Sequence, residues 1–464
     1  MVQQLKLLIK KYIPKKVLNL RHWFFALVGA LYYRNPSQEL LVIGVTGTSG
    51  KSTTIFLLRT ALEAVGYRVG SLSTIDFYIA GENKLNDQKM TMLGKMKIQK
   101  YLREMVDKKC DIALVETTSE GAVQYRHSFI NYDVMILTNL YPEHIESHGS
   151  FENYKQAKIS IFQHVGNSRR KKLDESEGPI PKVAIVNGDS IHAADFLNAA
   201  RFDRRYAFGR GEREVKDIEH YFTISEVRSE STGISFSFDT MRVAPRLYGV
   251  HNAENCAIAL SVLSILGCSV EKIRDSAHML ENAPGRTEFI HEAEDYGFRV
   301  IVDYAFEPKA IEALYRIVSE LAPKRIIHVF GSTGGGRDKS RRFSVGEYVG
   351  KHADIVFVTD EDPYDDDPFE IMKDVASAVE KRGKVPGKNL FIIADRREAI
   401  ERAVALATQG DIVLVTGKGS EQGMCVAGGA MIPWDDRTVV RESLTLREED
   451  ERAEKKEIKS LWSR

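Results

Sequence analysis

The sequence has little cysteine, and its few cysteines are scattered. The chain of 464 residues contains four of them, and no two form a CxxC pair. This spacing argues against a zinc ribbon and against a disulfide framework, because both need cysteines at short or regular intervals. A reducing compartment, the cytoplasm, is therefore the expected location. The four cysteines are Cys110, Cys256, Cys268 and Cys425.

The sequence also lacks an excess of charge of either sign. Lys and Arg together number 65, and so do Asp and Glu. Without a basic excess, nucleic acid is not expected as the main partner. The hydrophobic share of 43% and the charged share of 28% are ordinary for globular proteins. The length predicts two or three domains.

The aromatic and apolar run at residues 23–33 is too short to span a bilayer, which takes about 20 residues. It lies within a first stretch of 38 residues that contains seven Lys or Arg and no acidic residue. One interpretation is peripheral contact with an anionic membrane surface. The other is a helix docked on its own domain or on a second subunit, so both a monomer and a homodimer stay open. No small-residue cleavage site follows, and we expect a cytoplasmic protein, with membrane association as the alternative.

Short apolar runs recur from residue 40 onward, and most are continuous rather than alternating. Continuous runs are typical of strands buried on both faces, as in parallel sheets covered by helices. Helix-length amphipathic segments separate several of them, as at residues 56–65. The pattern predicts an α/β fold with parallel sheets, whose ligands bind beyond the carboxyl ends of the strands. The runs are residues 40–47, 111–118, 134–140, 182–189, 325–332, 354–362, 389–396 and 411–419.

The first of these runs leads into a Gly-rich turn, VIGVTGTSGKSTT, that precedes a predicted helix. Glycines let backbone N–H groups approach phosphate, and the helix N-terminus adds partial positive charge. Lys51 is expected to reach the β- and γ-phosphates, and the Ser52 hydroxyl to hold Mg²⁺. The strict GxxxxGK[ST] pattern fails because its first glycine falls on Val45, and the match is to a shorter G-T-x-G-K-[ST] form. ATP binding at residues 46–53 is the resulting prediction.

Shifts in composition divide the chain into four stretches. The charged region at 203–245 is predicted to form strands or an insertion before a helix at 252–266, and the PGR at 284–286 precedes a new apolar run at 298–305. We expect a short basic and aromatic N-terminal segment (1–40), a central P-loop-type parallel-sheet ATPase domain (41–297), a Rossmann-like C-terminal α/β domain (298–440) and a charged helical tail (441–464).

The short loop form and the motifs after it resemble the Mur ligase family, in family order over residues 41–440. Within the family the resemblance is greatest to the MurE branch. It implies an ATP-dependent ligase that forms an amide bond through an acyl phosphate and adds an amino acid to a peptidoglycan-precursor peptide. The motifs are LVETTSEG (114–121), TNLYPEHIESHGSFENYKQAKISIF (138–162), HNAENCAIAL (251–260), PGRTE (284–288), VDYAFEP (302–308), GSTGGGRDKSRR (331–342) and VTGKGSEQ (415–422).

The resemblance also implies a set of functional residues and two bound Mg²⁺ ions. The metal ligands it implies are Ser52, Glu116, His144 and Lys158, the last as a carbamylated lysine. Lys51, Glu116, His144, Lys158 and Arg286 are the implied catalytic residues. The implied ATP-binding residues are Gly47, Thr48, Ser49, Gly50, Lys51, Ser52, Thr53, Asn139, Asn252, Asn255, Arg286 and Asp303. The implied acceptor-binding residues are Thr91, Thr118, Gln124 and Arg126, and the implied amino-acid-binding residues are Asp362, Tyr364, Gly417 and Glu421.

Two departures from the family pattern bear on the substrates. Members that use diaminopimelate carry a D-N-P-R motif, whereas this chain has Glu361-Asp362-Pro363-Tyr364 and lacks the arginine. Lysine or ornithine then becomes an alternative to diaminopimelate. Members of the MurE branch also carry a UDP-binding domain before the loop, where this chain has 45 residues. The acceptor peptide is accordingly either UDP-linked or lipid-linked.

Three further alternatives stay open at this point. One is a ligase that acts on a lipid-linked precursor, and another is an amino-acid polymer synthase of the cyanophycin or poly-γ-glutamate kind. The third is a non-catalytic ATP-binding scaffold, which substitutions at several family positions allow. Those substitutions are Glu120, Glu143, Phe306, Gly336 and Ser420.

Overall fold

A computed structural model describes residues 15–84, 91–143, 148–174, 176–230 and 232–462. The chain divides into two compact units, unit 1 up to Glu281 and unit 2 from Asn282 onward. The sequence pattern places the boundary later, at 297/298. Strand β12 (Glu288–Phe289) explains the position found here, because it pairs antiparallel with β13 (Arg299–Asp303) in the sheet of unit 2.

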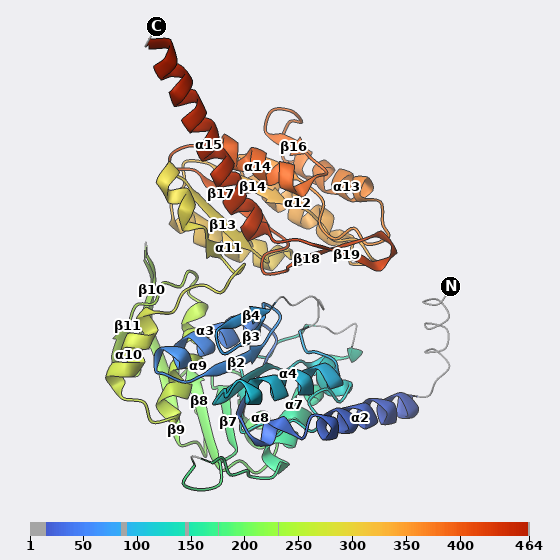
Figure 1. The fold of residues 1–464 in the computed structure, drawn as a ribbon, viewed down its shortest axis with the longest axis vertical. Coiled ribbons are helices and arrows are strands. Elements are labelled where there is room, and N and C mark those ends of the chain that lie inside the picture. The colour runs from blue at the N-terminus through green and yellow to red at the C-terminus, as the bar shows by residue number, and fades with distance from the viewer. Residues whose placement is uncertain (1–14, 85–90, 144–147, 175, 231, 463–464) are drawn as a thin grey trace. The chain divides into compact units, whose positions relative to one another are not determined.

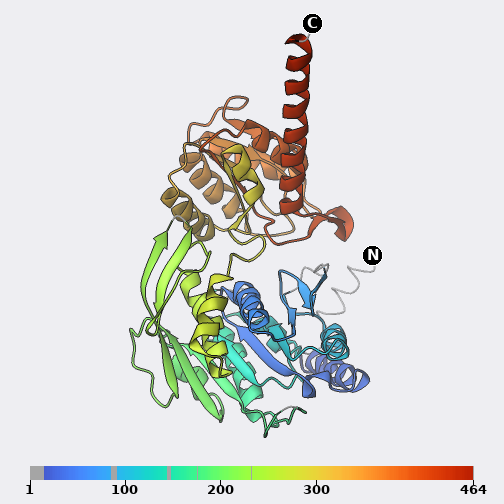
Figure 2. The same cartoon turned by 60° about the vertical axis from the view of Figure 1, so that its left-hand side comes forward.

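Unit 1 is built on an 11-stranded sheet in the order β11-β10-β9-β8-β7-β6-β1-β5-β2-β3-β4. The strands from β9 through β2 run parallel, while β9-β10-β11 and β2-β3-β4 pair antiparallel. Figures 1 and 2 show the twist of this sheet. The strands are β1 (Leu41–Thr46), β2 (Val69–Leu72), β3 (Phe77–Ile79), β4 (Glu82–Lys84), β5 (Ile112–Glu116), β6 (Val134–Leu137), β7 (Val183–Asn187), β8 (Arg204–Gly209), β9 (His220–Glu230), β10 (Gly233–Phe238) and β11 (Met241–Val243).

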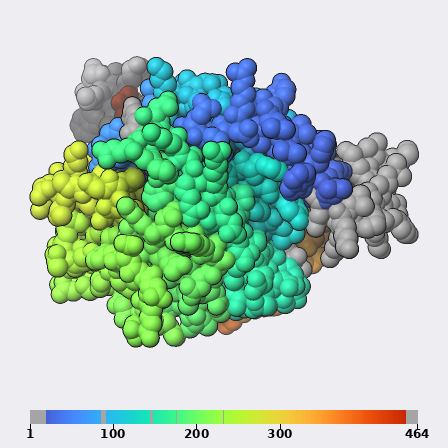
Figure 3. Space-filling model, turned by 90° about the horizontal axis from the view of Figure 1, so that it is seen from below, coloured from blue at the N-terminus to red at the C-terminus, as the bar shows by residue number. Residues whose placement is uncertain are grey.

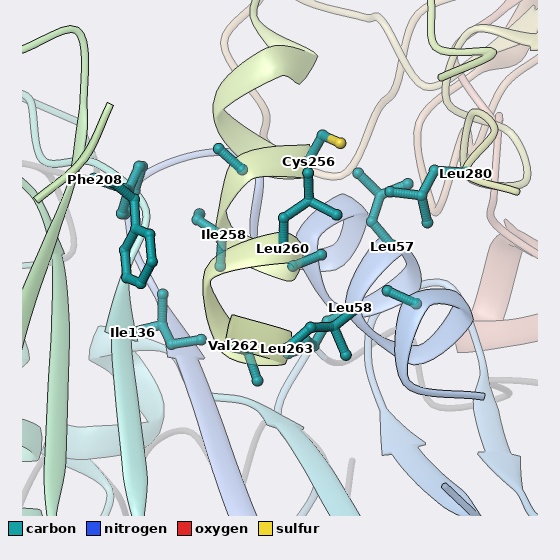
Figure 4. Packing of buried hydrophobic residues seen from close by; sticks show 14 of the residues in the cluster. Leu57, Leu58, Ile136, Phe208, Cys256, Ile258, Leu260, Val262, Leu263 and Leu280 are labelled. Atoms are coloured by element: carbon teal, nitrogen blue, oxygen red, sulfur yellow. The ribbon is translucent and has the colours of Figure 1, made fainter. Parts of the chain in front are cut away.

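Helices cover both faces of this sheet, as its continuous apolar strands require. Neighbouring strand residues point to opposite faces, so Ile43 joins the core under α3 and α9, whereas Val42 joins the core under α4 and α7. Figure 4 shows the first core, where side chains of α3 and α9 meet Ile136 and Phe208 of the sheet. The helices are α2 (Lys15–Tyr32), η1 (Pro36–Gln38), α3 (Lys51–Ala64), α4 (Lys95–Asp107), α5 (Ser119–Val123), α7 (Phe151–Asn167), α8 (Ala193–Leu197), α9 (Asn252–Ile265) and α10 (Val270–His278).

Unit 2 has a six-stranded sheet in the order β12-β13-β17-β14-β15-β16, parallel from β13 to β16. A two-stranded hairpin, β18-β19, follows it. The strands after β13 are β14 (Ile326–Phe330), β15 (Ile355–Val358), β16 (Leu390–Ile392), β17 (Ile412–Thr416), β18 (Gly423–Val426) and β19 (Ala430–Pro433). The helices are η2 (His291–Tyr296), α11 (Pro308–Glu320), α12 (Ser340–His352), α13 (Pro368–Glu380), α14 (Arg396–Leu406), η3 (Ala427–Gly429) and α15 (Asp436–Trp462).

Both ends of the described chain are helical. The C-terminal helix α15 begins at Asp436, before the charged tail expected from 441, and its first turns bury Val440 and Leu444 in the core of unit 2. The N-terminal helix α2 packs against α4 of unit 1. Within the described ranges, each helix is too short or too polar to cross a lipid bilayer.

Candidate active site

The Gly-rich turn joins β1 to α3, as the sequence predicts. Gly50 is the N-cap residue of α3 with φ of 77°, and a Cβ there would lie 2.6 Å from the Asn255 side-chain oxygen. Only glycine fits this combination of a left-handed conformation and a close neighbour. The turn thus leads directly into the N-terminus of α3, whose first backbone N–H groups are the kind of donors that bind phosphate.

Residues at the end of β6 hold the turn in place. The Ser49 N–H donates to Asn139 Oδ1 at 2.9 Å, and the Thr138 hydroxyl donates to the Ser49 carbonyl at 2.7 Å. The Lys51 ammonium folds back over the loop and donates to the carbonyls of Gly47 (3.1 Å) and Thr48 (2.9 Å). Asn139 and Lys51, both predicted to bind ATP, thus contact the same Gly-rich turn.

Helix α9 closes the other side of the turn. The Thr54 hydroxyl donates to Asn255 Oδ1 at 3.2 Å, and Asn255 Nδ2 donates to Asn252 Oδ1 at 2.8 Å. A long-range hydrogen bond therefore joins the predicted pair Asn252 and Asn255 to helix α3. Beside Asn139 opens a cavity of about 460 Å³, whose lining includes Tyr141, Asn187 and His192.

Glu116 links the phosphate loop to Thr91 of the sequence MTM (90–92), called here the acceptor motif because the family resemblance implies that Thr91 binds the acceptor. It is 1% exposed at the end of β5 and accepts the Ser52 hydroxyl at 3.0 and 2.9 Å through its two oxygens. The same carboxylate accepts the Thr74 N–H at 2.8 Å and the Thr74 hydroxyl at 3.2 Å. The Thr91 hydroxyl lies 3.0 Å from the Thr74 hydroxyl and donates to it, because the Thr74 proton goes to Glu116. The sequence missed Thr74, because no motif marks it and only the fold brings it to Glu116.

Lys158 lies beneath the loop and is 1% exposed. Its ammonium group donates to the Gly47 carbonyl at 2.8 Å and lies 4.7 Å from the centre of the Tyr154 ring. Burial, reinforced by the nearby charge of Lys51, holds the pKa of Lys158 well below its usual value, although Glu143 and Glu116 oppose the shift. Tyr154 also donates to the Thr48 hydroxyl at 3.1 Å, a contact that the sequence did not predict.

The remaining acceptor residues lie on and around α5. Thr118 is the N-cap residue of α5, and its hydroxyl accepts the Gly121 N–H at 3.0 Å. Gln124 accepts from Arg126 at 2.7 Å, and Arg126 also donates to the carbonyl of Met92, the neighbour of Thr91. His144 lies outside the described residues. Among the residues that are described, no three His, Cys, Asp or Glu side chains gather as a metal site.

Unit 2 brings together a second set of predicted residues. The Arg286 guanidinium lies 4.2 Å from the centre of the Tyr304 ring, and Asp303 accepts the N–H groups of Thr287 and Ala305, both at 2.6 Å. Burial raises the pKa of Asp303, while Arg286 and these N–H groups oppose the rise. Tyr304 donates to Glu421 at 2.9 Å, which extends the set toward the GKGSE motif.

Lys418 ties together the two acidic residues of the predicted amino-acid site. It is fully buried and donates to Asp362 at 2.8 Å and to Glu421 at 2.6 Å. Two carboxylates therefore share one ammonium group, which leaves the cluster with an excess of negative charge. The sequence predicts a functional motif around Lys418, but it does not predict a role for the lysine itself. Tyr364 has a φ of 54° and lies next to Gly335. In the sequence it occupies the position of the arginine of the D-N-P-R motif.

Comparison with known proteins identifies the protein family to which the chain belongs. The family model described as the Mur ligase middle domain matches residues 45–263, and the model described as the Mur ligase, glutamate ligase domain matches residues 285–419. The chain belongs to the Mur ligase family and is an ATP-dependent ligase.

Individual relatives narrow the likeness to one branch. The chain is 34% identical over 427 residues to a UDP-N-acetylmuramyl-tripeptide synthetase of Roseiflexus sp. (strain RS-1), with 90% of this chain and 81% of the relative covered. It is 31% identical over 419 residues to a UDP-N-acetylmuramoyl-L-alanyl-D-glutamate--2,6-diaminopimelate ligase of Clostridium acetobutylicum, with 90% and 80% covered. The branch expected from the motifs, MurE, is thereby confirmed.

Solved structures agree with this placement. One is a UDP-N-acetylmuramoyl-L-alanyl-D-glutamate--2,6-diaminopimelate ligase, 26% identical with a TM-score of 0.58, which covers 88% of this chain and 79% of that one. A folylpolyglutamate synthase of Mycobacterium tuberculosis complexed with ADP shares the fold at 17% identity and a TM-score of 0.63, with 90% and 96% covered. Nothing in these likenesses supports the polymer-synthase or scaffold alternatives.

Proposed function

We propose that this ligase joins an amino acid to the peptide of a peptidoglycan precursor. One observation carries the proposal. Glu116 bonds to Ser52 of the phosphate loop and, through Thr74, reaches Thr91 of the acceptor motif. A nucleotide phosphate at the loop and a carboxylate at Thr91 would therefore meet around one buried acidic side chain. Such an arrangement suits phosphoryl transfer from ATP to the acceptor carboxylate.

The chemistry follows from this placement. The acceptor carboxylate attacks the γ-phosphorus of ATP, the bond to ADP breaks, and an acyl phosphate forms. The incoming amine then attacks the acyl carbon, phosphate leaves, and the amine loses a proton. Lys51 and Arg286 would balance the negative charge of the phosphates, and Asp303 would bind the ribose. The adenine base would enter the cavity beside Asn139, whose volume of about 460 Å³ supports this placement.

The residues at the loop fit one Mg²⁺ ion, and the family resemblance implies a second; both would supply further charge neutralisation. A hydroxyl and a carboxylate, Ser52 and Glu116, already face each other at the loop, as oxygen-preferring Mg²⁺ requires. Lys158 and His144 are the proposed residues at the second ion. The lowered pKa of Lys158 favours its neutral amine, the form that reacts with CO₂ to give a carbamate and release a proton. That carbamate would turn a buried cation into an anion.

The proposed incoming amino acid is a diamino acid with one carboxylate, lysine or ornithine. Tyr364 cannot offer the bidentate contact that an arginine makes to a second carboxylate. The cluster of Asp362, Glu421 and Lys418 carries an excess of negative charge, which attracts an amine and repels a carboxylate. The acceptor proposed is the muramoyl dipeptide that the relatives' names contain.

A substrate panel tests these proposals. The full chain is incubated with ATP, UDP-N-acetylmuramoyl-L-alanyl-D-glutamate and either lysine, ornithine or diaminopimelate, and phosphate release and product mass are followed. We expect lysine or ornithine to exceed diaminopimelate in kcat/KM by about tenfold or more, the scale of one lost charged contact. Efficient use of diaminopimelate would contradict the proposed preference for lysine or ornithine. A parallel reaction with the same dipeptide linked to a lipid diphosphate decides which carrier the enzyme uses. If neither carrier gives a product, the proposal that the acceptor is the muramoyl dipeptide is wrong.

A further inference from the structure

Helix α2 carries an apolar face that the described residues of unit 1 leave exposed. Leu20, Phe24 and Leu31 are 66%, 55% and 60% exposed, and their spacing of four and seven residues places them on one side of the helix. Phe25 and Tyr32 continue the exposed face on the adjacent stripe. This set of five residues, called here the outer face, is one of the densest groups of exposed large hydrophobic side chains among the described residues.

The opposite side of α2 is firmly docked. Ala26 and Ala30 are buried, and Gly29 lies so close to α4 that a Cβ there would be 3.1 Å from the Met96 sulfur. The Lys95 ammonium group lies 2.7 Å from His22 Nδ1. The outer face is therefore held at the surface by packing on its other side, and the space-filling view shows α2 in darkest blue at the edge of unit 1 (Figure 3).

The C-terminal end of α2 is fixed as well. The Arg103 side chain donates to the carbonyls of Tyr33 (3.0 Å) and Arg34 (3.1 Å), just past the last turn. It also pairs with Glu39 at 2.7 Å. Since α2 is tied to α4 along its length and at its end, the outer face is presented in one orientation. A preformed apolar face avoids much of the entropy that ordering a loose helix would cost on binding.

The described charge on the outer face is basic. Arg21 is exposed one residue after Leu20, and the sequence of the first 38 residues contains seven Lys or Arg and no Asp or Glu. A symmetric dimer through this face would bring Arg21 toward its own copy, which the like charges disfavour. A surface that is both apolar and negatively charged at its rim matches the outer face better, and an anionic lipid bilayer has that chemistry.

We propose that the outer face of α2 docks the ligase on the surface of a membrane containing anionic lipids. Leu20, Phe24 and Leu31 would enter the boundary between headgroups and acyl chains, and Arg21 would stay among the lipid phosphates. The docked helix adjoins the acceptor residues, because α4 begins three residues after Met92, whose carbonyl accepts from Arg126. The bilayer would then lie next to the acceptor side of unit 1. This attachment does not depend on which amino acid is added.

Vesicle co-sedimentation of the full chain tests the proposal. The vesicles consist of phosphatidylcholine alone or of phosphatidylcholine with phosphatidylglycerol, and the outer-face variant combines Leu20→Glu, Phe24→Glu and Leu31→Glu. We expect the parent chain to bind the anionic vesicles and to bind less as salt is raised. The variant should lose binding by roughly tenfold or more, because three apolar anchors become anions.

A matched control separates the outer face from general surface charge. Val270→Glu, Met279→Glu and Phe369→Glu add the same three charges at residues that are equally exposed elsewhere, and this variant should still bind the vesicles. Binding that survives in the outer-face variant, or a parent chain that never binds anionic vesicles, would overturn the proposal. So would a dimer of the parent chain in light scattering that the outer-face variant splits into monomers, since a second copy would then be the occupant. ATP turnover with a water-soluble acceptor reports separately on the proposed function.

Discussion

Lys158 is a basic side chain placed where a charged amine is costly, because it is buried and lies near the charge of Lys51. If it acts as a carbamate, its replacement removes an anion from the site. We expect Lys158→Ala to lower phosphate release by about a hundredfold or more, and added bicarbonate not to restore it. The measurement is steady-state phosphate release with saturating ATP.

Lys155 supplies the control on the same helix. It is a more exposed lysine that pairs with Glu152 and Asp195, away from the loop. Lys155→Ala should keep near-parental phosphate release. A Lys158→Ala enzyme with full activity would contradict the carbamate role.

Glu361 gives a prediction about stability and pH. Burial raises its pKa from 4.5 to about 7, although Arg396 and Lys418 oppose the shift. Between these values the folded chain keeps a proton that the unfolded chain releases. The stabilisation by this group is thus fully present below pH 4.5 and is lost as the pH rises through 7, a change of about 3 kcal/mol.

The variant Glu361→Gln mimics the protonated form and should remove this pH dependence. Urea unfolding measures the free energy of unfolding of the variant and of the parent. We expect the difference in favour of the variant to be larger at pH 8 than at pH 5. Glu370→Gln on α13 is the control, because Glu370 is an exposed carboxylate at the start of that helix. Equal shifts of the two variants between pH 5 and pH 8 would refute the raised pKa.

Helix α3 offers a comparison between its two ends. Gly50 caps its start at φ of 77°, where an added Cβ would lie 2.6 Å from Asn255, whereas Gly66 follows its end at φ of 101° in open space. Gly50→Ala should cost about tenfold or more in kcat/KM for ATP, since the strained turn must move away from the phosphates. Gly66→Ala should cost only about 1 kcal/mol of stability and leave kcat/KM near the parental value. Equal kinetics of the two variants would show that the turn tolerates the change.

The strands could largely be predicted one by one. Each of the eight continuous apolar runs contains one parallel strand, because burial on both faces selects apolar residues at successive positions. The three short strands β2, β3 and β4 gave no comparable signal, as β3 and β4 pair antiparallel at an edge and have only three residues each. The hydrophobic pattern of a three-residue segment is too short to indicate a strand, and pairing with neighbouring strands decides its conformation.

Strand order lies beyond local pattern altogether. The Val42 N–H donates to an Asp133 carboxylate oxygen 91 positions away, and Lys171 and Lys182 pair with the same buried aspartate. These contacts help to hold β1 and β6 side by side in the sheet. In the sequence alone, Asp133, Lys171 and Lys182 look like ordinary charged residues of the surface. The same limit applies to the site: motifs located Glu116 and Thr91, while Thr74 between them became visible only in the fold.

At the scale of the whole molecule, the phosphate loop and the proposed amino-acid site belong to different units. Unit 1 holds the loop, and unit 2 holds the cluster around Lys418. Lys51→Ala should therefore weaken ADP binding about tenfold or more, because it removes a phosphate ligand. Asp362→Asn should leave ADP affinity unchanged and raise the KM for lysine about tenfold, because the cluster loses its excess charge.

Titration calorimetry with ADP and steady-state kinetics with lysine separate these effects. Asn keeps a side-chain oxygen that can accept the Cys425 N–H, so Asp362→Asn changes charge with little change of shape. A loss of ADP affinity in Asp362→Asn would show that the cluster around Lys418 does not act on the amino acid alone.

The bridge through Glu116 has a consequence for how the substrates bind. One carboxylate serves Ser52 on the nucleotide side and Thr74 on the acceptor side, so a ligand that reorients either hydroxyl changes what the other side experiences. Affinities for ATP and for the acceptor peptide should then be thermodynamically linked, each substrate altering the dissociation constant of the other by the same factor. Synergism between substrates would be a property of a single side chain rather than of a moving domain.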